Sequence, residues 1–127
     1  MKLRIKGSSI RLRTVRPEVA QLVNTGRVEE TLRFAPGDDA MLTYALVTDT
    51  AATEFEVRYN PHEITVVVPA GQARRWASSD EVGMYCEIDL GSAGSLELSI
   101  EKDFACLDRS DADNKDTFPH PQLGVVP

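Results

Sequence analysis

The sequence contains few of the residues that most often build active sites. Its 127 residues include two cysteines, two histidines and one tryptophan. No Cys-x-x-Cys pair anchors a zinc site, and neither histidine lies near a cysteine in the sequence to serve as its base. No apolar run approaches the roughly 18 residues of a membrane span. These scarcities argue against a cysteine nucleophile, a zinc site and a transmembrane helix, and they predict no cofactor.

The first residues also lack the apolar block of a secretory signal, because MKLRIKGSSIRLR alternates charged and apolar side chains. We therefore expect a cytoplasmic protein in which Cys86 and Cys106 are reduced thiols. Cys86 shares the apolar face of its segment with Met84 and Ile88, which predicts core packing. Acids flank Cys106 and oppose formation of its thiolate.

Acidic residues are missing from the first 16 positions, which carry six basic side chains, although the whole chain has a net charge of −6. A basic hairpin here could contact the phosphates of a nucleic acid. Alternatively, it lies beside acidic strands of its own chain. The acidic total and the lack of aromatic residues between the basic ones favour the second interpretation.

Short periodic segments predict the secondary structure. Period-two alternation predicts a hairpin in LRIK and SIRLR, around Gly7, and further strands in VEETLRF, MLTYALV, EFEVRY, ITVVV, VGMYCEID and SLELSIEKDF. Pro17, Glu18 and Gly26 are typical of the start and the end of a helix over 17–25. A second helix is expected over 72–78, with Trp76 on its apolar stripe.

Both halves of the chain follow the order strand, strand, helix, strand, strand, and adding 54 to a position reaches its counterpart. Leu3 then corresponds to Val57, and Gly37 to Gly91. This register predicts an α+β domain with an internally duplicated ββαββ unit, in pseudo-repeats 1–50 and 54–104. About eight antiparallel strands would curl into a barrel-like sheet with two short helices. The domain would span 1–107, before an acidic, Pro-rich tail at 108–127.

The charged strand faces raise one enzymatic alternative. Glu54-x-Glu56-x-Arg58 resembles the E-x-E-x-K signature of the triphosphate-tunnel proteins, although arginine replaces the lysine and the motif lies mid-chain. That resemblance implies a divalent metal such as Mg or Mn on Glu54, Glu56 and Glu101. It implies phosphate binding by Arg4, Arg11 and Arg58. The competing interpretation leaves these charged faces in solvent and the apolar faces inside.

The segment EKDFACLDR closes the last predicted strand. We expect Asp103, Asp108 and Arg109 to form an ion network that fixes the chain where it leaves the sheet. The following DRSDADNKD lacks the glycine and the closing glutamate of a calcium loop, so it reads as a polar exit segment.

Blocks along nearly the whole chain resemble an uncharacterised family of short bacterial proteins: KLRIKGSSIRLR, PEVAQLVNTGRVEETLRF, LTYAL, and EKDFACLDR followed by FPHP. The resemblance implies no reaction. The leading interpretation is a non-enzymatic binding module for a protein partner or a small ligand. The triphosphate tunnel and a nucleic-acid contact through the basic hairpin are the alternatives, and the oligomeric state stays open.

Overall fold

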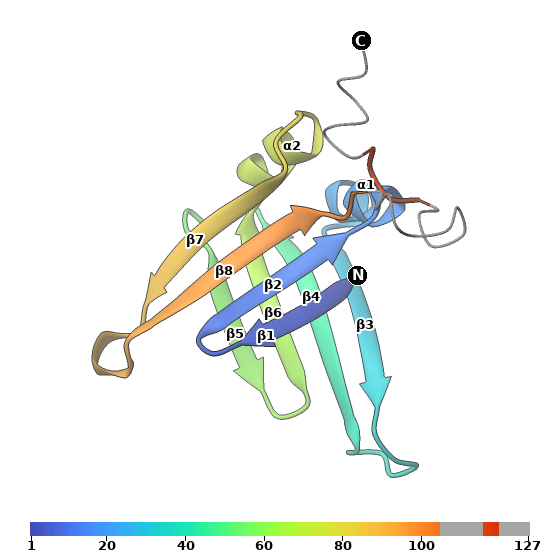
Figure 1. Ribbon diagram of the computed structural model, residues 1–127, viewed down its shortest axis with the longest axis vertical. Helices are drawn as coiled ribbons and strands as arrows, with labels where there is room; N and C mark the ends of the chain where they lie inside the picture. Colours follow the sequence, from blue (N-terminus) through green and yellow to red (C-terminus); the bar gives the residue numbers. More distant parts are fainter. Residues whose placement is uncertain (105–115, 120–127) are drawn as a thin grey trace.

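Two four-stranded sheets pack against each other, and two helices cover one end of the pair (Figure 1). The computed structural model describes residues 1–104 and 116–119. Sheet A has the strand order β1 (Lys2–Lys6), β2 (Ser9–Thr14), β8 (Ser95–Lys102) and β7 (Gly83–Asp89). Sheet B has the order β3 (Arg27–Arg33), β4 (Met41–Asp49), β6 (Glu63–Pro69) and β5 (Glu56–Asn60). The helices are α1 (Arg16–Thr25) and α2 (Ala70–Ala77), and a 3-10 turn η1 (Gly91–Ala93) precedes β8.

Each sheet combines two antiparallel hairpins through one parallel pair. In sheet A, β2 runs parallel to β8, and in sheet B, β4 runs parallel to β6. The expected antiparallel barrel is therefore wrong in two respects: the sheets are mixed, and neither closes on itself. The physical reason is that each hairpin pairs with a hairpin from the other half of the chain. This pairing leaves four edge strands in the described ranges.

Local sequence sets the helix ends close to the predicted positions. Near the start of α1, Glu18 Oε1 accepts a 2.9 Å hydrogen bond from the Val15 N–H. Pro17 suits the first turn because proline has no N–H group that would need a partner there. Gly26 ends the helix with a φ of 83°, a left-handed conformation that favours glycine, and its N–H bonds the Leu22 carbonyl. The prediction for α1 is confirmed within one residue, and α2 begins two residues earlier than expected.

The core lies between the sheets and under the helices. It combines inner-face residues such as Leu12 and Ile100 of sheet A with Leu46 and Val66 of sheet B. Trp76 of α2 is fully buried among them and donates its indole N–H to the Val82 carbonyl at 3.3 Å. Because strand side chains alternate between faces, the charged residues between these apolar ones lie on the outer faces. The predicted apolar faces therefore point inward.

The order ββαββ occurs twice among the described elements. β5 spans Glu56–Asn60, which is β1 shifted by 54, and β6 begins 54 positions after β2. This correspondence is one of architecture, and a duplicated origin stays a prediction. The boundary between a domain at 1–107 and a tail at 108–127 falls outside the described residues and also stays a prediction.

Two glycines give a matched test of the packing. A Cβ on Gly83 would lie 2.8 Å from the Ile100 carbonyl oxygen of the paired strand, whereas a Cβ on Gly71 of α2 would meet nothing within 4 Å. We expect Gly83→Ala to lower the free energy of unfolding by about 1–3 kcal/mol, since the backbone must shift. Gly71→Ala should leave it unchanged or raise it by up to about 1 kcal/mol. Urea denaturation measures both, and equal effects would contradict this packing.

Candidate functional site

The residues predicted for a triphosphate tunnel are divided between two sheets. Arg4 and Arg11 are register partners on the outer face of sheet A. Arg58 and Glu56 lie on the outer face of sheet B, where the Arg58 Nε donates to Glu56 Oε1 at 3.2 Å. Glu54 is exposed and precedes β5. The structure thus brings Arg4 to Arg11 and Arg58 to Glu56, but the two pairs face opposite sides of the molecule.

Glu101, the third predicted metal ligand, is held by neighbours on sheet A. Its Oε1 lies 3.3 Å from Arg11 Nε and 3.6 Å from Arg13 Nε, and its Oε2 accepts a 2.8 Å hydrogen bond from the Tyr85 hydroxyl. Burial, and then this carboxylate, raise the pKa of Tyr85. Residues 1–104 and 116–119 contain no group of three acids, histidines or cysteines that could hold a metal. The resemblance to triphosphate-tunnel proteins is not supported, and the proposed ligand roles stay predictions.

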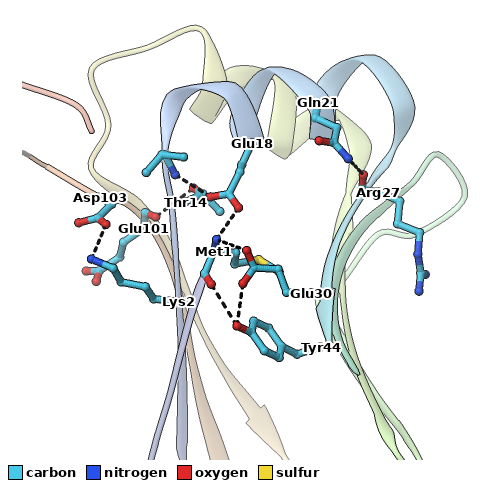
Figure 2. Close-up of polar contacts among 11 residues, drawn as sticks. Met1, Lys2, Thr14, Glu18, Gln21, Arg27, Glu30, Tyr44, Glu101 and Asp103 are labelled. Atoms are coloured by element: carbon cyan, nitrogen blue, oxygen red, sulfur yellow. Dashed lines mark hydrogen bonds and ion pairs between the residues drawn. The ribbon is translucent and has the colours of Figure 1, made fainter. Parts of the chain in front are cut away.

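Asp103 lies where β8 leaves sheet A. Its Oδ2 pairs with Lys2 Nζ at 2.9 Å (Figure 2), its N–H bonds the Thr14 carbonyl, and its carbonyl accepts the Phe118 N–H. These contacts tie the end of β8 to β1, to β2 and to the segment at 116–119. The other two members of the expected exit network, Asp108 and Arg109, lie outside the described residues, as does Cys106.

A polar cluster at the first residue links the two sheets, and sequence reasoning missed it (Figure 2). The amino group of Met1 donates to the carboxylates of Glu18 and Glu30, and the Tyr44 hydroxyl donates to Glu30 Oε2 at 2.8 Å. Burial, followed by the hydrogen bond to Glu30, raises the pKa of Tyr44 to about 12. One feature of the sequence could have indicated this cluster. Glu30 is an acid on the strand face that it shares with the apolar Val28 and Leu32.

A cleft opens beside this cluster, between β1 of sheet A and the inner face of β3 and β4. Its volume is about 500 Å³. Apolar side chains dominate the lining, with Glu30 and Thr31 as polar members: Leu3, Glu30, Thr31, Leu32, Leu42 and Tyr44. We call this the β1–β3 cleft. It is concave, largely apolar and lies along an open sheet edge, which are properties of binding sites.

Inner-face side chains become exposed as the edge strands run away from the helices. Ile5, two residues beyond the half-buried Leu3, is 57% exposed. In β3 the buried Val28 is followed on the same face by Leu32, which is 50% exposed. Phe34, just after the end of β3, is 67% exposed. Tyr59 in β5 follows the same trend. The helices cover one end of the sandwich and the hairpins lie at the other (Figure 1). At the hairpin end these large apolar side chains are exposed to solvent.

The free edge of β1 also carries unpaired positive charge. Within the described ranges β1 pairs with β2 alone, so its other edge has no partner strand. Lys2, Arg4 and Lys6 alternate with Leu3 and Ile5 along it. Lys2 binds Asp103, but among the described residues neither Arg4 nor Lys6 makes an ion pair. The edge thus combines a basic outer side with an apolar inner side next to the cleft.

The sequence blocks that run along the chain have a counterpart among known families. The chain belongs to DUF7009, a family of unknown function whose model matches residues 1–122. Membership confirms the expected uncharacterised family. No curated protein and no solved structure matches the chain. Among the described residues, no helix is long and apolar enough to cross a membrane.

The cluster at Met1 gives a prediction for alkaline pH. The pKa of Tyr44 is raised to about 12 in the folded protein, from about 10 in the unfolded chain. The protonated hydroxyl therefore contributes its full stabilisation below about pH 10. This contribution is lost as pH rises from about 10 through about 12. We expect wild type to show a tyrosinate absorbance transition near pH 12 that Tyr44→Phe lacks. Tyr59→Phe, which alters an exposed tyrosine, should keep that transition, and its loss there would contradict the assignment.

Proposed function

We propose that this chain is a non-enzymatic binding module that takes up an extended segment of a partner protein along the free edge of β1. The segment would alternate acidic and apolar residues. The observation that carries the proposal is a combination of three features at one edge: a strand side that pairs with no other described strand, basic side chains that form no ion pair with a described residue, and the β1–β3 cleft. An added strand at an exposed sheet edge is a common mode of peptide recognition.

The backbone of β1 supplies the affinity expected of such a mode. A strand that pairs on one side leaves N–H and C=O groups free on its other side, and these are ready to bond a further strand. Side chains on the added strand alternate between the two faces of sheet A. Those on the inner face would lie beside Leu3 and Ile5 and enter the β1–β3 cleft. Those on the outer face would lie beside Arg4 and Lys6.

Charge identifies the chemistry of the partner. Antiparallel pairing of β1 with the β1 of a second copy would put Arg4 opposite Arg4 and Lys2 opposite Lys6, and like charges directly opposite each other are destabilising. Self-pairing of β3 would similarly bring Arg27 opposite Arg33. Acidic residues on the partner instead complement Arg4 and Lys6. An acidic partner segment is therefore favoured over a second copy.

Nucleic acid is the competing occupant of this edge, because exposed Tyr85 lies in the same cross-strand row as Arg4 and Arg11 on the outer face of sheet A. Bases could stack on such a ring. Two facts weigh against it. Glu101 and Asp103 already engage Arg11, Arg13 and Lys2, and strand β8 also carries Glu97. The apolar β1–β3 cleft has no role in phosphate binding.

A fluorescent peptide of alternating glutamate and valine tests the proposal by anisotropy. We expect it to bind, and an alternating lysine and valine peptide not to bind. Arg4→Glu should weaken binding about tenfold or more, because it replaces attraction by repulsion at a close pair. Ile5→Ser should weaken it without any change of charge. The control is Arg75→Glu on α2, which changes the net charge by the same amount at a position far from the β1 edge. It should leave peptide binding unchanged.

The remaining outcomes decide against the proposal. Equal binding of both peptides, or equal loss in Arg4→Glu and Arg75→Glu, would remove the charge argument. Binding of single-stranded DNA with a steep salt dependence, lost in Arg4→Glu and kept in Ile5→Ser, would assign the edge to nucleic acid instead.

A further inference from the structure

A groove separate from the β1 edge lies between the two helices. Its volume is about 520 Å³, within the range of small-molecule sites. Residues of α1, residues from the end of α2 and one residue of the C-terminal segment line it: Arg16, Val19, Ala20, Val23, Asn24, Arg74, Ala77, Ser78 and Phe118. Both helices lie at the end of the molecule opposite the hairpins (Figure 1). We call this the interhelical groove.

One side of α1 provides the apolar floor. Val19, Ala20 and Val23 follow the spacing of three and four residues that places side chains on one helix face. Val19 is buried in the core, whereas Val23 is 40% exposed although it continues the same face. Ala77 lines the groove from α2, and Phe118 adds an aromatic wall. The groove therefore offers apolar surface that stays exposed although the two helices lie next to each other.

Two arginines give the groove its charge. Arg16 and Arg74 both line it, and among the described residues no carboxylate does. Within the described residues neither guanidinium makes an ion pair or a side-chain hydrogen bond. Glu18, on the same helix as Arg16, is engaged by the Met1 amino group. A guanidinium presents donors in a planar fork that matches a carboxylate.

We propose that the interhelical groove binds a small amphipathic anion, a molecule with an apolar chain and one carboxylate, such as a medium-chain fatty acid. The chain lies along Val19, Val23 and Ala77, and the carboxylate accepts hydrogen bonds from Arg16 and Arg74. Within residues 1–104 and 116–119 the lining has no acid and the two guanidinium groups have no ion pair, and this favours an anion over a cation or a neutral alcohol. This site uses neither strand β1 nor the β1–β3 cleft.

The test is an isothermal titration with three probes of equal chain length, each kept below its micelle concentration. We expect decanoate to bind, and decanol and decyltrimethylammonium to bind at least about tenfold more weakly, since they lose the charge-assisted hydrogen bonds. Arg16→Gln and Arg74→Gln should each weaken decanoate binding by about tenfold. Arg75→Gln is the matched control, because Arg75 is the neighbouring arginine on α2 and does not line the groove.

A second variant tests the apolar part. Ala20→Trp should fill the groove and abolish decanoate binding, while circular dichroism and the melting temperature verify that the exposed position on α1 tolerates the ring. Equal binding of all three probes, equal loss in Arg74→Gln and Arg75→Gln, or full binding by folded Ala20→Trp would overturn the proposal. The peptide assay on Arg74→Gln should stay unchanged, so failure at this site leaves the β1 proposal separately testable.

Discussion

The parallel pairing of β2 with β8, and of β4 with β6, is the constraint on which the rest of the molecule depends. It places Leu12 beside Ile100 in sheet A and Leu46 beside Val66 in sheet B, so each sheet joins residues from the two halves of the chain. Neither half could bury its apolar faces alone, because each contributes one hairpin to each sheet. The β2–β8 pairing joins segments far apart in the sequence, and hydrophobic burial must offset the conformational entropy lost on closing that loop.

The same pairing makes the two ends of the sandwich unequal. Both connections that pass from one sheet to the other through a helix lie at one end, where Leu22 and Trp76 fill the space between the sheets. Among the described residues the opposite end holds hairpin connections of two to seven residues and no helix longer than the single turn η1, so the inner faces there stay uncovered. Exposed Ile5 and Phe34 follow from this asymmetry. The open end is therefore a consequence of topology rather than of unusual local sequence.

Several charged residues that the structure describes stabilise the fold through ion pairs and hydrogen bonds. Arg27 of β3 reaches Glu63 of β6 at 2.9 Å, and its hydrogen bond is the main cause that lowers the pKa of Glu63. Lys102 is buried, and its Nζ lies over the rings of Trp76 and Phe118 and donates to the Ser79 carbonyl at 2.6 Å. Burial lowers the pKa of Lys102.

Other basic side chains form no ion pair within the described residues, and four of them lie at the two proposed sites. Arg4 and Lys6 lie on a free strand edge, and Arg16 and Arg74 line the interhelical groove. In both places the charge adjoins uncovered apolar surface. This combination of charge and apolar surface distinguishes the two proposed sites from the ordinary solvated faces of the sheets.

The sequence by itself determined the elements and their faces. Alternation in SIRLR and SLELSI marks one buried side, and Pro17 and Gly26 bound α1, because these signals act over a few residues. Tertiary structure alone decided which strands pair, whether the sheet closes, and which charges meet. Alternation with period two fits any partner strand equally well, so it could not place Arg4 and Arg58 on different sheets. The β1–β3 cleft and the interhelical groove arise only where distant segments meet, and no local pattern encodes that meeting.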